Sequence, residues 1–205
     1  MTILAGRLAR QWLRVALVTA PMAAMVALPS GSGALDAWPV QSSQNPDAAQ
    51  VADFLKRVKE YADLREKLKQ TLPTLAEQAP PEDIQQHQRA LERLIARARA
   101  AAKRGDIFTQ PIRAYFRRQL SRVFSGPDGA RSRRTIMDEN PRTIRLRVNS
   151  RYPDGAVLTN MPPQLLLLLP ALPPQLEYRF VGEDLVLLDL ESAMVVDYID
   201  EAIDS

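Results

Sequence analysis

Side chains that commonly carry catalysis are scarce in this sequence. Histidine occurs once, at His87, and cysteine does not occur, so a multi-histidine metal site, a thiolate metal site and a cysteine nucleophile are impossible within one chain. The spacings of phosphate-binding loops, G-x-S-x-G turns, H-E-x-x-H zinc sites and calcium loops do not occur either. A catalytic set would have to consist of carboxylates, serine, tyrosine, lysine and arginine, and no spacing selects a pair. We therefore expect no enzyme activity, no metal and no cofactor, and the sequence identifies no small-molecule substrate.

Charged residues are distributed unevenly along the chain. Between Arg89 and Arg151 there are seventeen arginines and lysines and five acidic residues, a net charge of +12. From Leu176 onward, nine acidic residues accompany Arg179 alone, a net charge of −8. The basic block could bind a polyanion or an anionic membrane surface. Alternatively, the basic and acidic parts face each other within the fold or across a dimer.

Several charged residues are candidates for contact with a partner. They are Arg131, Arg133, Arg134, Arg145, Arg147, Arg179, Asp189 and Asp197. Asp189 falls on an apolar strand face, where an unpaired carboxylate is costly, so it either contacts a partner or sits at the sheet's rim and accepts hydrogen bonds from a nearby turn. Arg179 and Asp197 could bind a ligand, although a cross-strand ion pair explains them without one. His87 stands among glutamines and is expected to be solvated.

The last stretch of the chain positions most of these residues. Between Leu176 and Ile199 the apolar residues form three β-rich segments, separated by Gly182-Glu183 and by Glu191-Ser192, which predicts a three-stranded antiparallel meander. Gly182 suits a type II′ hairpin turn, which needs a positive φ at that position.

Two-residue turns at both connections set the register. One face then carries the pairs Phe180–Leu185, Tyr178–Leu187, Leu185–Tyr198 and Leu187–Val196, and should be core. The other face carries Glu177, Arg179, Val186, Leu188, Val195 and Asp197, and is half-covered or meets a partner. The second turn lacks Gly or Asn, and a one-residue slip there would exchange the faces of the third strand.

Helical spacing dominates the first half of the folded part. An amphipathic helix is predicted from Asp47 to Gln70, and a second from Pro81 to Gly105, joined by a proline-rich turn. Their similar lengths predict an antiparallel helical hairpin. A third helix follows from about Pro111 to Val123.

Shorter features lie between the helices and the meander. Residues 126–134 read as an exposed loop, and alternation from Ile144 to Val148 predicts a strand with Arg145 and Arg147 on its solvated side. Two copies of P-P-Q-L, at Pro162 and Pro173, should each open a short helical turn. The run Leu165–Leu169 could be a buried helical turn or a short strand, and proline at the first position favours the turn, wedged between helices and sheet.

The N-terminal residues have the composition of a targeting signal. Arg7, Arg10 and Arg14 precede an apolar run from Val15 to Leu28, and small residues allow cleavage after Ala34. The run is about fourteen residues, shorter than the ~20 of a spanning helix. We predict a cleaved signal peptide over 1–34, with an uncleaved anchor as the alternative, and a disordered leader over 35–46. Residues 47–205 then form one domain, with a helical part (47–125) and a sheet part (141–205), expected in the periplasm.

Two stretches carry a resemblance to known proteins. AKRGDIFTQPIRAYFRRQL and LPPQLEYRFVGEDLVLLDLESAMVVDYIDEAI, within residues 50–203, resemble a family of exported bacterial proteins to which no activity is attached. The resemblance implies export and a compact domain. The closing strands also loosely resemble the C-terminal module of periplasmic nickel and cobalt homeostasis proteins, which implies a metal-stress role that the single histidine does not favour.

These observations predict an α+β fold in which a helical hairpin and a third helix pack on a small antiparallel sheet. As function we expect a non-catalytic exported module that contacts another envelope protein or itself, through the mixed sheet face or the basic stretch. The alternative is a polyanion or anionic membrane-surface binder using residues 89–151. Nucleic acid is not the expected polyanion, because export argues against it and few aromatic residues interleave the arginines.

Overall fold

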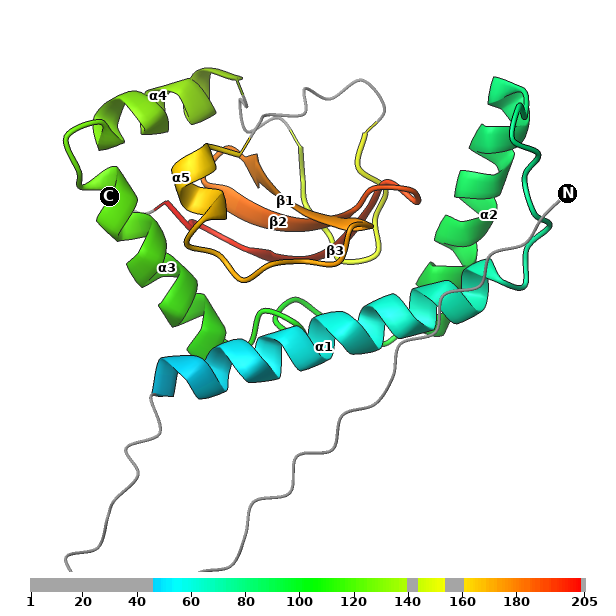
Figure 1. Cartoon of the computed structure of the whole chain (residues 1–205), viewed down its shortest axis with the longest axis horizontal. Helices are drawn as coiled ribbons and strands as arrows, with labels where there is room; N and C mark the ends of the chain where they lie inside the picture. Colours follow the sequence, from blue (N-terminus) through cyan, green and yellow to red (C-terminus); the bar gives the residue numbers. More distant parts are fainter. Residues whose placement is uncertain (1–45, 140–143, 154–160, 204–205) are drawn as a thin grey trace, which may run out of the picture. The chain divides into compact units, whose positions relative to one another are not determined.

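The computed structural model describes residues 46–139, 144–153 and 161–203. The elements in chain order are α1 (Pro46–Lys69), α2 (Pro81–Ala98), α3 (Gln110–Phe124), α4 (Gly129–Glu139), α5 (Pro163–Leu166), β1 (Leu176–Val181), β2 (Asp184–Asp189) and β3 (Met194–Ile199) (Figure 1). The α+β class, with helices packed on a small antiparallel sheet, is confirmed. The predicted signal peptide (1–34) and nearly all of the predicted leader (35–46) lie outside the described residues.

The sheet has the order β1-β2-β3, and its first hairpin is as predicted. Tyr178 pairs with Leu187 and Phe180 with Leu185, so β1 and β2 have the expected register. Gly182 has a φ of 58°, the left-handed conformation that the tight turn requires and that glycine adopts without steric cost.

The second hairpin differs from the prediction through a bulge. Asp189 pairs with Met194 and Leu188 with Val195 as expected, but the register then shifts and Leu187 pairs with Asp197. Val196 is the extra residue, so the predicted pairs Leu187–Val196 and Leu185–Tyr198 are wrong. A bulge changes the direction of the side chains that follow it, and here Asp197 leaves the mixed face and points toward residues 105–108, in the loop between α2 and α3.

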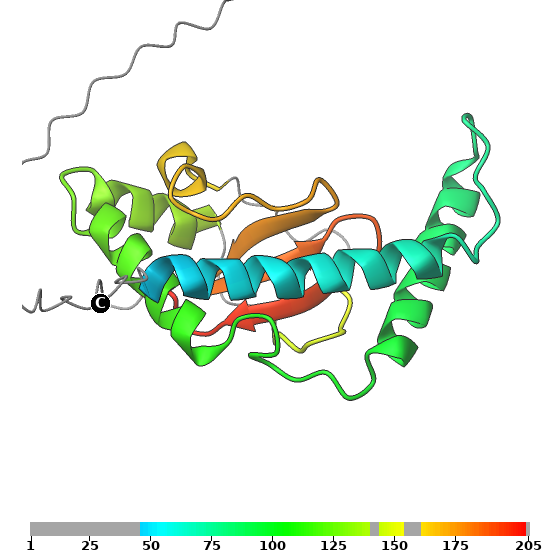
Figure 2. The same ribbon diagram turned by 60° about the horizontal axis from the view of Figure 1, so that its bottom comes forward.

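Helices cover one face of the sheet and form the main core. Figure 2 shows α1 crossing in front of the strands, with α3 at one end. The rings of Phe54, Phe108 and Phe116 lie 5.4 Å from one another, and Phe116 lies 5.7 Å from Tyr178 of β1. These contacts bury the α1 stripe against α3 and the sheet, as the three-and-four spacing requires.

Helix α2 contacts the core only through its C-terminal half, so the helical hairpin is splayed. Leu91 and Ile95 are buried, whereas residues 81–86 are all exposed. Figure 1 shows α2 rising steeply away from the end of α1. The physical reason is composition, because Ile84 is the one large apolar residue in the first two turns. The helix also ends at Ala98 rather than at Gly105.

The outer face of the sheet is covered, which corrects the idea of a partly open mixed face. Val186, Leu188 and Val195 are buried beneath Tyr152, and Ile144 and Leu146 pack at their side. The strand that the sequence predicted over residues 144–148 does not form. Instead the chain passes over the face, which needs apolar cover, and bonds to β3 farther along, where the Asn149 N–H donates to the Val195 carbonyl (2.8 Å) and the Val195 N–H to the Ser150 carbonyl (2.9 Å).

Three further local predictions are corrected in part. Most of the predicted loop 126–134 belongs to α4, which docks by burying Ile136. The run Leu165–Leu169 does begin as a helical turn, α5, yet only its first and last leucines are buried. The second P-P-Q-L forms a turn rather than a helix, with the Leu176 N–H bonded to the Pro173 carbonyl at 2.9 Å.

Candidate functional site

Polar side chains from α1, α2 and the β2–β3 turn meet in one group, which we call the Asp189 cluster. It comprises Tyr61, Arg65, Lys69, His87, Asp189 and Glu191. The three α1 residues are spaced by four, so they lie on one face of the helix. The acidic residues come from the end of β2 and the turn after it.

Asp189 is fully buried and fully engaged. Its Oδ2 accepts hydrogen bonds from the Tyr61 hydroxyl and from Arg65 Nε, both at 2.8 Å, and its Oδ1 accepts one from the Ser192 N–H at 3.0 Å. Burial, followed by the charge of Asp189, raises the pKa of Tyr61 above its ordinary value, so the hydroxyl stays protonated and donates. Asp189 therefore fastens α1 to the sheet and is not available to a partner.

Glu191 extends the cluster toward the surface. It accepts hydrogen bonds from Arg65 Nη2 and from Lys69 Nζ, the latter at 2.9 Å. Burial alone would raise the pKa of Glu191, but the hydrogen bonds and charges of Lys69 and Arg65 outweigh it and hold this pKa below its usual range. Glu191 is therefore ionised at neutral pH.

The side chain of His87 is largely buried rather than solvated, which corrects the sequence-based expectation. Its side chain is 8% exposed, and its Nε2 lies 3.7 Å from Glu191 Oε1, too long for a hydrogen bond. That nitrogen and the Ser192 hydroxyl have no hydrogen-bond partner among the described residues. The cluster thus contains acidic and basic groups, but its carboxylates are held by arginine, lysine and backbone N–H groups, an arrangement suited to fastening elements together rather than to proton transfer.

Asp197 forms a separate set of polar contacts, apart from the Asp189 cluster. Its carboxylate accepts the backbone N–H groups of Gly105 (2.9 Å), Ile107 (2.9 Å), Phe108 (2.8 Å) and Tyr198 (2.8 Å). Successive N–H groups in a turn form a concave site for an anion, and here β3 supplies the anion. The cross-strand pair with Arg179 is not what holds Asp197. Arg179 instead bonds to Glu177 on its own strand.

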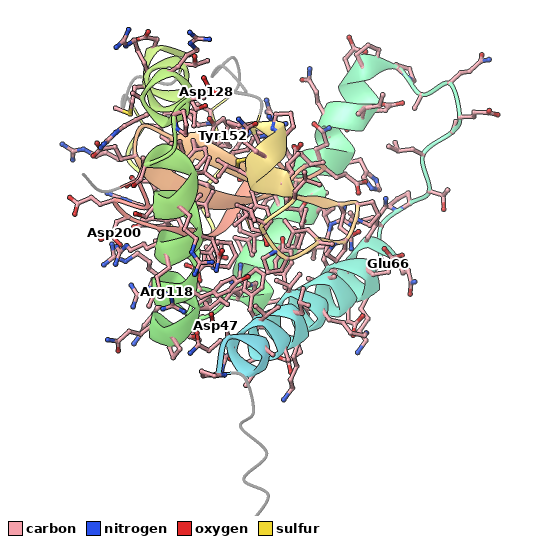
Figure 3. The ribbon with its side chains drawn as sticks, turned by 60° about the vertical axis from the view of Figure 1, so that its left-hand side comes forward. Asp47, Glu66, Arg118, Asp128, Tyr152 and Asp200 are labelled. Carbon is pink, nitrogen blue, oxygen red and sulfur yellow. The ribbon has the colours of Figure 1, made fainter. Side chains whose placement is uncertain are left out.

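Part of the basic block pairs with the acidic part inside the fold. Arg104 lies 2.8 Å from Asp200, and Arg117 Nη2 donates to the Asp200 carbonyl at 2.8 Å, in the region where Figure 3 labels Asp200 beside α3. Arg133 of α4 bonds to Glu183 (3.3 Å) and to the Ile203 carbonyl. These pairs neutralise part of the positive charge that would otherwise be available to bind a polyanion.

The remaining candidate arginines are exposed and fall in two places, and Arg145 and Arg147 line one cavity together with Arg104. Arg131 and Arg134 lie on α4, and Arg145 and Arg147 lie in the segment over the outer sheet face. Four residues of the Asp189 cluster were missed by sequence reasoning, namely Tyr61, Arg65, Lys69 and Glu191. Arg65 gave a usable signal, because it is a charged residue on the apolar stripe of α1.

A groove of about 620 Å³ lies next to the Asp189 cluster, between α2 and the preceding loop. We call it the α2 groove. Its apolar lining includes Leu72, Leu75, Ala76, Ala79 and Ala90. Arg89 and Arg93 line it from α2, and His87 is shared with a smaller cavity of about 400 Å³ beside Glu191.

Metal and membrane features can be stated for the described residues only. Within residues 46–139, 144–153 and 161–203, no three metal-ligating side chains are grouped to hold an ion, and no helix combines the length and apolarity needed to cross a membrane. Comparison with known proteins yields no matching family model, no similar curated sequence and no similar solved structure.

Proposed function

We propose that this chain is an exported, non-catalytic protein that binds another protein, and that the partner docks in the α2 groove. The mixed sheet face, which the sequence had suggested as the contact surface, is covered by Tyr152 and its neighbours. The carboxylates of the Asp189 cluster are occupied internally. The α2 groove is a candidate surface that has room for a partner and an apolar wall to bind it.

The first two turns of α2 carry this proposal. Helices in proteins are stabilised mainly by packing one face, and two turns without such packing are marginal. Residues 81–86 are exposed, and Ile84 is 39% exposed although it continues the stripe of Leu91 and Ile95. Asp83 and Gln86 of these two turns line the α2 groove, although Ile84 does not, so a partner segment in the groove would contact this part of the helix and supply packing that the chain itself does not.

The lining indicates the chemistry of the partner. Leu75, Ala79 and Ala90 offer an apolar wall, which suits a partner's leucine or aromatic side chain. Arg89 and Arg93 are one turn apart on α2, so both can meet carboxylates on the same segment. We therefore expect an amphipathic segment with acidic residues beside its apolar anchor.

Site-specific photo-crosslinking in the producing cells tests this proposal. Benzoylphenylalanine at Gln86, which lines the groove, should give a discrete adduct, whereas the same group at Lys56, on the exposed face of α1, should not. Reversing Arg89 and Arg93 to glutamate should abolish the Gln86 adduct without changing the far-UV circular dichroism spectrum. An adduct that forms equally at both positions, or that survives the charge reversal, would refute the groove as the docking site.

A further inference from the structure

Three consecutive leucines project from the surface just after α5. Leu166 is 51% exposed, Leu167 86% and Leu168 39%. A run of exposed apolar residues is unfavourable in water and is normally kept only for function. We call these three residues the leucine tip. It lies away from the α2 groove, at the other end of the sheet in Figures 1 and 2.

The leucine tip is held in place by the fold. Leu165 and Leu169, on either side, are buried in the main core. The Tyr178 hydroxyl donates to the Pro170 carbonyl at 3.0 Å, which fastens the end of the turn to β1. Prolines at 162, 163 and 170 restrict the backbone further. The leucines are thus presented on a stiff support, so burying them against another surface would order little additional backbone.

The backbone of the tip is also suited to an apolar environment. The N–H groups of residues 165–169 all donate to carbonyls within the same turn, at 2.9 to 3.3 Å. An unsatisfied N–H group is costly in a lipid phase, and these five would not be unsatisfied. A shallow position, at the boundary between headgroups and acyl chains, leaves the outer carbonyls in contact with water.

Exposed arginines lie on the neighbouring helix. Figures 1 and 2 both draw α5 next to α4, which carries Arg131 and Arg134. Both arginines are exposed and are three residues apart, so they lie on one face of α4. A small apolar anchor gives only marginal membrane binding, and a basic pair beside it supplies the second contribution that anionic lipids reward.

We infer that the leucine tip inserts into the interface of an anionic membrane, while Arg131 and Arg134 contact lipid phosphates. A convex apolar tip with internally bonded N–H groups fits a fluid surface. The charge favours phosphate-bearing lipids over neutral ones. This inference does not depend on the α2 groove, since the two surfaces share no residue.

A fluorophore at the tip tests the inference directly. The chain has no cysteine, so Leu167→Cys or Leu190→Cys gives a single site for an environment-sensitive label such as NBD. Leu190 is the matched control, because it is also exposed (43%) but lies in the β2–β3 turn. With full-length protein and phosphatidylglycerol vesicles, the label at 167 should brighten and shift to the blue, and the label at 190 should not. Because each label reports its own surroundings, binding by another part of the chain would not produce this difference.

Two further comparisons separate lipid from other partners. Arg131→Glu with Arg134→Glu should weaken the signal at 167 by about 30-fold or more in apparent vesicle affinity, and neutral phosphatidylcholine vesicles should behave similarly. Heparin should compete for the arginines without producing the blue shift itself. The inference is overturned if the label at 167 stays in water on anionic vesicles, if both labels respond alike, or if heparin alone reproduces the signal.

Discussion

Replacing Asp197 by alanine removes the oxygen atoms that receive the N–H groups of the 105–108 turn. Ile107 and Phe108 are buried, so their N–H groups would have no access to water, whereas those of Gly105 and Tyr198 are partly exposed and can rehydrate. Each stranded buried donor costs about 1 to 3 kcal/mol. We therefore expect Asp197→Ala to lower the free energy of unfolding by about 4 kcal/mol.

Asp197→Asn gives a graded comparison. Both buried donors bond to Oδ2, so an asparagine with its oxygen at that position keeps them and turns its NH₂ group toward the two half-exposed donors. Its loss should be smaller, about 1 to 3 kcal/mol.

Urea unfolding at pH 7, followed by far-UV circular dichroism, measures both losses. The control is Asp53→Ala, which removes a surface pair with Arg57 and should cost less than about 1 kcal/mol. A loss below about 1 kcal/mol for Asp197→Ala, or a larger loss for asparagine than for alanine, would refute the reasoning.

Three other substitutions test the remaining contacts. Arg65→Met should cost about 3 to 5 kcal/mol in the same urea assay, because it strands a buried carboxylate, against less than about 0.5 kcal/mol for Lys59→Met at a surface pair. The depressed pKa of Glu191 contributes stability that is present above the unfolded-state pKa and is lost as pH falls through the folded-state pKa. The stability difference between the parent and Glu191→Gln should therefore shrink in acid, and a pH-independent difference would contradict the assigned ion pairs. Gly129→Ala places a Cβ 2.0 Å from the backbone at the end of α3 and should cost about 2 kcal/mol or more by thermal unfolding, whereas Gly126→Ala, with its nearest contact at 3.2 Å, should cost clearly less.

The elements that the sequence predicted well are those with a strong local signal. Alternation together with Gly182 determined the β1–β2 register, and proline and charge placement determined the start of α2. These signals act over a few residues, so they do not depend on the rest of the fold.

The features that the sequence did not reveal depend on distant contacts. The bulge at Val196 has no glycine or other local sign, and it forms where Asp197 can reach the N–H groups of residues 105–108. The sequence of α4 predicted a loop because it begins with GARSRR, but the helix is stabilised by the burial of Ile136. The placement of His87 beside Glu191 likewise depends on how α2 meets the β2–β3 turn.

The Asp189 cluster shows which part of this difficulty could have been avoided. A buried aspartate on the apolar face of β2 required a cation, and Arg65 was a cation on an apolar helix face. Matching these two residues would have located the contact between α1 and the sheet. The direction of α2 could not have been found in this way, because its glutamine-rich first half contains no buried charged residue that requires an opposite charge.

The attachment of residues 105–108 to Asp197 has a consequence for the order of events during synthesis. A nascent chain emerges with its N-terminus first, so the turn that contains Gly105 leaves the ribosome some ninety residues ahead of the carboxylate that completes it. Arg65 precedes its partner Asp189 by a longer stretch of chain, 124 residues. Arg65 cannot form its contact until β2 has been made, and the turn at residues 105–108 cannot form its contacts until β3 has been made. We therefore expect the first three helices to remain loosely associated until then, and to consolidate together with the meander in one late step.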